Sequence, residues 1–113
     1  MIPIQLLNIA NQFHIFHFQT RLYSEHKLFQ KIYESFRDYA DRIVEATYYD
    51  EPLILEETNS VNLGNFEPSE PTNILIDLRT EIVENLNKST VRDNVYQDLL
   101  EDVNKFLFLL TLK

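Results

Sequence analysis

Hydrophobic residues recur every three or four positions along most of this chain, the spacing that predicts amphipathic helices. The first such segment covers about residues 3–20. Two sets follow the helical spacing there: Leu6, Ala10, Phe13 and His17, and also Leu7, Ala10, His14 and Phe18. The second extends from about Ser24 to Tyr49, with an apolar face of Phe29, Ile32, Phe36, Ala40 and Ile43. Ser24 is the expected N-cap of this second helix, with Glu25 in its first turn.

Two more helices are predicted in the second half of the chain. One covers about Pro71 to Lys88, and its apolar face is Leu75, Leu78, Ile82 and Leu86. The other begins after a cap at Ser89 or Thr90, and its apolar face is Val95, Leu99, Val103, Phe106 and Leu110.

The helix-breaking residues lie outside these apolar patterns. The single glycine is Gly64, and the four prolines are Pro3, Pro52, Pro68 and Pro71. Residues 50–70 form the only long connection, whereas short turns join the first helix to the second and the third to the fourth. We therefore predict an all-α fold, a ferritin-like four-helix bundle of two hairpins joined by a long crossover, as a single domain over residues 1–113.

Composition limits the classes of partner. The net charge is −8, from 10 basic and 18 acidic residues, which argues against nucleic acid as a partner because phosphate binding needs clustered Lys and Arg. No apolar run is long enough to cross a membrane, and the N-terminus lacks a secretory signal pattern. With no cysteine, disulfides and thiolate chemistry are excluded, and a cytoplasmic setting is expected.

Four residues form the candidate functional site: His17, His26, Asp41 and Glu45. Imidazole nitrogens and carboxylate oxygens are the ligand types that bind iron, manganese or zinc. At about 100° per residue, Asp41 lies about 60° and Glu45 about 100° from His26 around the second helix, away from its apolar face. A metal bound by these side chains would therefore face a neighbouring surface or a second subunit.

Simpler explanations exist for each of these residues. His17 lies in the apolar face of the first helix, where it is alternatively a core histidine whose ring nitrogens have protein partners. Asp41 and Glu45 are alternatively part of a solvated helix face. Like charges at this i, i+4 spacing repel each other, however, and a bound cation removes that cost. His14 also points to the apolar side, and we assign it a packing or supporting role.

The chain resembles the mini-ferritins known as DNA-binding proteins from starved cells. Their second helix carries the motif His-x3-Asp-x10-Asp-x3-Glu, and this chain has His26-x3-Gln30-x10-Asp41-x3-Glu45. In that family a histidine followed by an aromatic residue ends the first helix, as do His17 and Phe18 here. The spacing from His17 to His26 is shorter than in the family, whereas His14 has the family spacing but no aromatic residue after it.

A second resemblance covers nearly the whole chain. It is to small ferritin-like proteins encoded by tailed phages, at residues 17–20, 23–27 and 104–112 and at Asp41-x3-Glu45. The mini-ferritin resemblance implies a ferroxidase site whose ligands come from two subunits. Gln30 in place of a carboxylate weakens a second metal position, and the basic N-terminal tail with which many mini-ferritins hold DNA is absent.

These observations lead to two hypotheses. The first is a homo-oligomeric metal-binding protein in which His17 and His26 of one chain meet Asp41 and Glu45 of another, with Fe, Mn or Zn bound and Fe(II) oxidation as the implied chemistry. The second is a non-catalytic interaction protein of a phage, which binds a phage or host protein in the host cytoplasm or in the virion. In that case the polar set is an interface network, and residues 106–110, which are apolar on all sides, are a docking surface.

Overall fold

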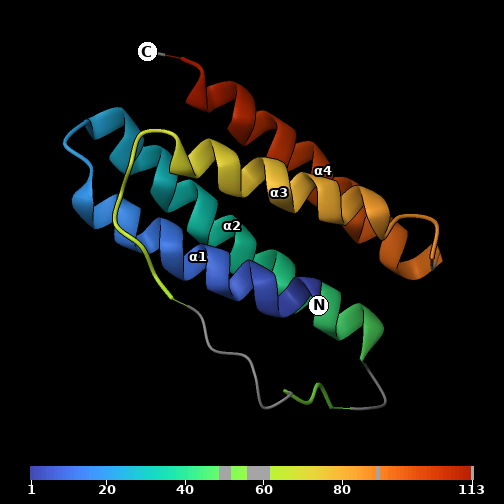
Figure 1. Cartoon of the computed structure of the whole chain (residues 1–113). Coiled ribbons are helices and arrows are strands. Elements are labelled where there is room, and N and C mark those ends of the chain that lie inside the picture. Colours follow the sequence, from blue (N-terminus) through green and yellow to red (C-terminus); the bar gives the residue numbers. More distant parts are fainter. Residues whose placement is uncertain (49–51, 56–61, 89, 113) are drawn as a thin grey trace.

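The computed structural model of the chain describes residues 1–48, 52–55, 62–88 and 90–112. These residues contain four α-helices and no β-strand: α1 (Ile2–Gln19), α2 (Tyr23–Thr47), α3 (Glu70–Glu84) and α4 (Thr90–Leu110) (Figure 1). The predicted all-helical class is therefore confirmed for the described part of the chain. None of these four helices combines the length and the apolar composition that a membrane span requires.

The helices pack as two hairpins that lie against each other (Figure 1). α1 packs along α2 and α3 along α4, while α2 contacts α4 and α1 contacts α3. Across the α2–α4 boundary the Tyr39 hydroxyl donates to Asp102 Oδ2 at 2.7 Å, and Arg42 Nη2 donates to Asp98 Oδ2 at 3.0 Å. Residue numbers rise on α2 as they fall on α4, so these two helices are antiparallel.

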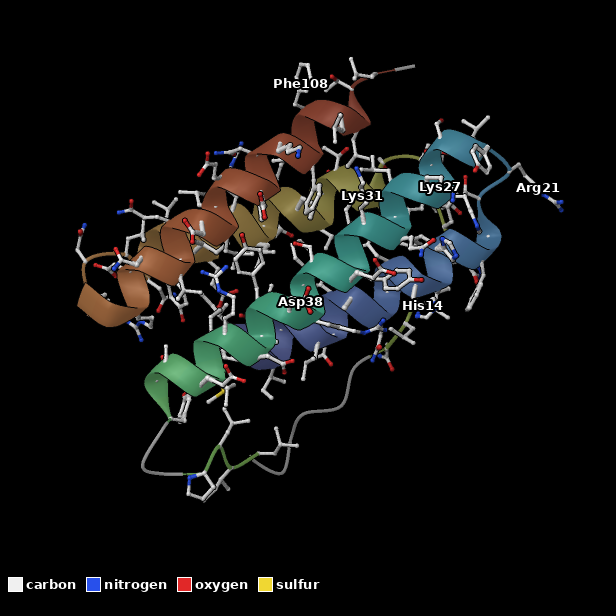
Figure 2. All side chains as sticks on the ribbon, turned by 180° about the vertical axis from the view of Figure 1, so that it is seen from behind. His14, Arg21, Lys27, Lys31, Asp38 and Phe108 are labelled. Atoms are coloured by element: carbon white, nitrogen blue, oxygen red, sulfur yellow. The ribbon has the colours of Figure 1, made fainter. Side chains whose placement is uncertain are left out.

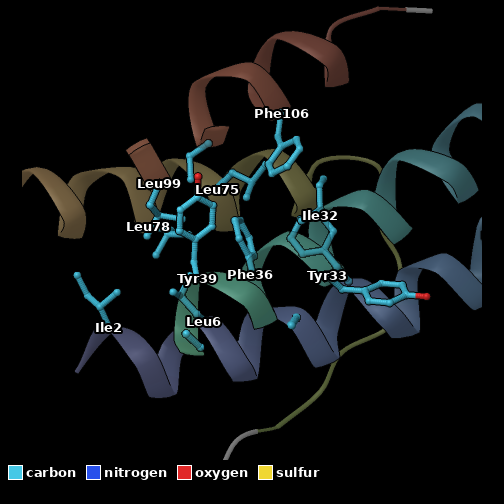
Figure 3. Packing of buried hydrophobic residues seen from close by; sticks show 14 of the residues in the cluster. Ile2, Leu6, Ile32, Tyr33, Phe36, Tyr39, Leu75, Leu78, Leu99 and Phe106 are labelled. Carbon is cyan, nitrogen blue, oxygen red and sulfur yellow. The ribbon is translucent and has the colours of Figure 1, made fainter. Parts of the chain in front are cut away.

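The core lies between the hairpins and is built from the predicted apolar faces (Figure 3). The predicted inward residues of α2 are all buried, as are Leu6, Ala10, Phe13 and His17 of α1. Leu7 and Phe18, which follow the same spacing on α1, are instead 42% and 70% exposed. In α3 and α4 every predicted inward residue except the last is buried. Leu86 and Leu110, the two exceptions, are partly buried against the same core. Phe13 is at the centre of an aromatic cluster, with edge-on contacts to Phe16, Phe29 and Phe36.

Two glutamines of α1 attach the connection between α2 and α3 to the bundle. Gln12 Nε2 donates to the Gly64 carbonyl at 2.8 Å, and the Gly64 N–H donates back to Gln12 Oε1 at 2.7 Å. Two helical turns later, Gln19 Oε1 accepts the N–H of Phe66 at 2.6 Å. The Phe66 ring then packs on Phe16 and Phe29, so the segment before α3 follows the second half of α1.

The structure corrects the expected start of the second helix. Ser24 is not the N-cap, because α2 begins at Tyr23 with Leu22 at the cap position and no side-chain cap bond. Thr20 makes side-chain hydrogen bonds at this helix start: its Oγ1 accepts the Leu22 N–H at 3.3 Å and donates to Glu25 Oε1 at 2.8 Å. Glu25 is in the first turn, as expected, where its charge favours the helix N-terminus.

The third helix is shorter than predicted. It ends at Glu84 and not near Lys88, because Asn85 Nδ2 donates to the Glu81 carbonyl and Asn87 takes a left-handed conformation with φ of 66°. The Asn87 N–H then donates to Asp93 Oδ2 in the first turn of α4. α4 begins at Thr90, and the alternative cap, Ser89, lies outside the described residues.

Candidate functional site: the histidines of the first hairpin

His17 and His26 are brought together by the short turn between α1 and α2. His17 is in the last turn of α1 and His26 is in the first turn of α2. Their rings stack, with centroids 3.6 Å apart and planes inclined by 20°. His17 is 8% exposed and His26 is half-buried.

The two histidines make a reciprocal pair of hydrogen bonds. His17 Nδ1 is 2.7 Å from the carbonyl oxygen of His26, and His26 Nδ1 is 2.9 Å from the carbonyl oxygen of His17. A carbonyl oxygen only accepts, so Nδ1 carries the hydrogen in both rings. In the neutral form of each ring, Nε2 then keeps its lone pair, and this nitrogen can bind a metal. The helix ends therefore set the same tautomer in both imidazoles.

His14, the third histidine of the chain, is in a different state. Its ring stacks on Tyr33 with centroids 4.1 Å apart, and Arg37 Nη2 lies 3.2 Å from His14 Nδ1. Since guanidinium nitrogens only donate, His14 Nδ1 accepts and its Nε2 carries the hydrogen. Burial, and then the charges of Arg37 and His17, lower the pKa of His14 below 6.5. The lowered pKa favours the neutral ring, and the contacts with Tyr33 and Arg37 agree with a packing role.

Asp41 and Glu45 lie far from the histidines within one chain. Asp41 follows His26 by 15 positions on the same helix, which corresponds to about 22 Å along its axis. Both carboxylates are exposed, and they border a shallow cavity of about 230 Å³ between α1 and α2. Its floor includes Leu7 of α1 and Val44 of α2.

One chain does not gather the four predicted ligands. Across residues 1–48, 52–55, 62–88 and 90–112, no three His, Asp or Glu side chains are arranged to hold a metal ion. Gln30, the position that departs from the mini-ferritin motif, is occupied by a bond from its Nε2 to Glu34 Oε1 at 3.0 Å. The predicted site required ligands from two chains, and a single chain leaves that prediction open.

The exposed face of α2 has an uneven distribution of charge (Figure 2). Lys27 and Lys31 lie toward the hairpin turn, where Arg21 also projects, whereas Asp38 lies beyond the middle of the helix. Asp41 and Glu45 continue the acidic half toward its end, and all of these charged side chains are exposed. The face is basic at one end and acidic at the other.

Sequence reasoning missed the two residues that fix the third histidine, Tyr33 and Arg37. The guanidinium of Arg37 lies 4.9 Å from the centre of the Tyr33 ring, on which His14 also packs. The signal was available, since both residues follow His26 on α2 at the i+7 and i+11 positions that share its side of the helix.

A protein-family model matches residues 17–110, a range that contains both histidines and both carboxylates of the candidate site. The family is described as a family of unknown function (DUF5856). Comparison with curated proteins and with solved structures gave no match. Since the matched region includes the end of α1 and all of α2, α3 and α4, the chain belongs to the DUF5856 family.

Proposed function

We propose that this protein is a mini-ferritin-like metal-binding protein that holds iron, or manganese or zinc, between two copies of the chain. His17 and His26 of one copy and Asp41 and Glu45 of the other are the proposed ligands. The observation that carries the proposal is the pair of Nδ1–H bonds to backbone carbonyls. Metal-binding histidines are commonly oriented in this way, with the second ring nitrogen left for the metal.

The charge pattern of α2 supports a second copy as the source of the carboxylates. If two copies of α2 pack antiparallel about a two-fold axis, the basic half of each meets the acidic half of the other. A register that pairs Lys31 with Asp38 of the second copy places His26 opposite residue 43 of that copy. Asp41 and Glu45 of the second copy then flank His26, and the dimer contains two equivalent sites.

The order of the helices is compatible with a ferritin-like bundle. Such bundles consist of two antiparallel hairpins joined by one long connection that spans the bundle. Here α1 pairs with α2 and α3 with α4, and the end of the connection is attached along α1 by Gln12 and Gln19. The four-helix bundle is compatible with many functions, so the proposal rests on the histidine geometry and not on the fold.

The residues of this chain have defined tasks in the proposed site. The two carbonyl groups hold the imidazoles in one tautomer and one orientation, and the carboxylates supply negative charge that a cation neutralises. Gln30 offers a neutral oxygen where mini-ferritins have a carboxylate, so we expect one strong metal position per site. A bound iron would supply the redox chemistry of Fe(II) oxidation by O₂ or peroxide.

Complementation between two variants tests this proposal directly. His26→Ala removes a histidine ligand, and a chain with both Asp41→Ala and Glu45→Ala lacks the carboxylates. Each variant alone should bind no metal at the site. After unfolding and co-refolding, half of the dimers are mixed and one of their two sites is complete, so about a quarter of the wild-type metal content should return.

Elemental analysis and metal titration with Fe(II), Mn(II) and Zn(II) measure that recovery. The matched control is Glu101→Ala, which removes an exposed acid of α4 that lies outside both the site and the proposed α2–α2 interface, and it should bind metal as the wild type does. No recovery in the mixture, or no metal in the wild type, would exclude an inter-subunit site. Metal should also tighten the oligomer in sedimentation experiments, since binding and assembly share the same residues.

The second candidate function is a non-catalytic interaction protein of phage origin, present in the host cytoplasm or in the virion. Of the predicted docking residues 106–110, Phe106 is buried and Leu107 and Leu110 pack against the core, so most of that run faces inward. The remaining support is Phe108, which is 61% exposed (Figure 2), and Leu112 just beyond the helix, which is 59% exposed. Single exposed apolar residues are normal on protein surfaces, but two large ones near one helix end favour a protein partner.

Phe108→Ser separates the two hypotheses. If the protein is an interaction protein, the Phe108→Ser variant should no longer recover a phage or host protein in a binding experiment, while its metal content stays that of the wild type. As a metal-binding protein, His26→Ala should lose the metal and Phe108→Ser should not. A dimer or a virion-bound copy without metal would support the interaction protein, whereas a metal-loaded closed shell would exclude it.

A further inference from the structure

A cavity lies at the end of the bundle opposite the α1–α2 turn, where α1 and α4 begin and α2 and α3 end. Its volume is about 230 Å³, and residues of all four helices line it. One water takes about 30 Å³, and pockets for drug-sized ligands are about 300–1,000 Å³, so the cavity suits a small metabolite. It is separate from His17 and His26, which are at the other end of α1 and α2.

One part of the cavity wall is apolar and consists of Ile2, Pro3 and Ile43. Ile2 and Ile43 are 3% and 1% exposed, so this wall is part of the bundle core. It would accommodate an aliphatic group of about the size of a valine or leucine side chain.

The rest of the wall carries both signs of charge. Glu81 of α3 and Arg92 of α4 line the cavity, together with Asn85 and the phenol groups of Tyr48 and Tyr96. The guanidinium of Arg92 lies over the Tyr96 ring, 5.2 Å from its centre. A guanidinium has five N–H donors, more than one partner uses.

Two hydroxyl groups of this wall are suited to a polar ligand. Thr47 Oγ1 is buried and has no hydrogen-bond partner within the described part of the chain. Buried hydroxyls are nearly always bonded, so this one calls for an explanation. Tyr96 is 3% exposed, and burial raises its pKa, so its hydroxyl remains a donor at neutral pH.

A ligand must therefore match a cationic group, an anionic group and an apolar wall in a small volume. A carboxylic acid alone would meet Glu81 as a like charge, and an amine alone would meet Arg92 as a like charge. A free α-amino acid has a carboxylate for Arg92, an ammonium group for Glu81 and a side chain for the apolar wall. A residue within a peptide has neither charge, and a terminal residue has only one.

We propose that the cavity lined by Thr47, Glu81, Arg92 and Ile43 is a binding site for a free aliphatic α-amino acid. Arg92 binds the carboxylate, Glu81 binds the ammonium group, and the Thr47 hydroxyl forms a hydrogen bond with the ligand. This inference does not depend on the proposed metal site, and its test involves no metal.

The test is a titration of the full chain with three probes, in which the amide chemical shifts are measured by NMR. The probes are L-leucine, 4-methylpentanoate, which lacks the ammonium group, and 3-methylbutylamine, which lacks the carboxylate. Both analogues are smaller than leucine, so steric exclusion cannot weaken them. Leucine should shift the amides of residues around the cavity, and each analogue should bind at least about tenfold more weakly.

Substitutions assign the two charges. Glu81→Gln should weaken leucine to about the level of 4-methylpentanoate without weakening that acid, and Arg92→Gln should weaken leucine to about the level of the amine. The matched controls are Glu84→Gln and Lys88→Gln, which remove the same charges from exposed positions outside the cavity. Thr47→Val keeps the shape of the side chain but removes the hydroxyl that is proposed to bond the ligand. This variant replaces Arg92→Gln in the test if Arg92→Gln does not fold.

The outcomes are decisive in both directions. Preference for leucine over both analogues, lost in Glu81→Gln and kept in Glu84→Gln, establishes the site. No shift with leucine at millimolar concentration overturns the proposal, as does equal binding of all three probes or equal behaviour of Glu81→Gln and Glu84→Gln.

Discussion

The hydrogen bond between Tyr39 and Asp102 joins the two hairpins, and Tyr39→Phe removes it without changing the shape of the ring. Tyr39 is 8% exposed, and its hydroxyl points toward α4 (Figure 3). A hydrogen bond to a charged group contributes about 1.5–3 kcal/mol. Asp102 is partly exposed, so water can replace the lost donor, and we expect a cost near the low end, about 1.5 kcal/mol.

The matched control is Tyr33→Phe. Tyr33 is also 8% exposed, but its hydroxyl points away from the core (Figure 3). Removal of that oxygen should change the free energy of unfolding by less than about 0.5 kcal/mol. Urea unfolding at neutral pH, followed by circular dichroism, compares the three proteins. Equal stability of the two variants would refute the assignment of Tyr39–Asp102 as a link between the hairpins.

The same pair predicts an alkaline pH dependence. Burial, then the hydrogen bond to Asp102 and the charge of Asp102, raises the pKa of Tyr39 above its ordinary value of 10.0. The folded state therefore holds this proton more tightly than the unfolded state. The resulting stability is fully present below pH 10 and is lost as the pH rises through the pKa of the folded protein. The stability difference between wild type and Tyr39→Phe should thus be constant up to pH 10 and shrink above it.

Three more predictions follow from the packing, the attached connection and the charge. Phe13→Ala should cost about 3–5 kcal/mol of unfolding free energy because Phe13 is fully buried among aromatic rings, whereas Phe18→Ala, at a 70% exposed position, should cost less than about 0.5 kcal/mol; equal costs in urea unfolding would contradict the described core. Gln12→Ala should raise hydrogen exchange at the amide of Gly64, which loses its acceptor, and unchanged exchange would show that this bond is not formed in solution. The chain should not bind duplex DNA at about 150 mM salt, because its net charge is −8 and the small basic group of Arg21, Lys27 and Lys31 releases few counterions; salt-sensitive micromolar binding in a fluorescence assay would show otherwise.

Several features of the fold could be predicted because they are local. The apolar residues of α2 lie on one face at helical spacing, and any partner surface buries them, so the stripe from Phe29 to Ile43 identified the core side without knowledge of the partner. The prolines lie at or outside the helix ends, which made the four helices predictable to within a few residues. The end of α3 was mispredicted because its early stop depends on Asn85, Asn87 and a bond to Asp93 in the next helix.

The site was only partly predictable from the sequence. His17, His26, Asp41 and Glu45 could be chosen by residue type and helical spacing, since these are properties of the chain. Their distances could not, because the His17–His26 stack depends on the turn that aligns two helix ends and on two carbonyl groups that fix the tautomers. Likewise, the cavity between Glu81 and Arg92 exists only where four helix ends meet, and no spacing along the chain specifies that meeting. Periodicity determines which face of a helix is buried, whereas tertiary packing decides which polar groups from distant segments come within reach of one another.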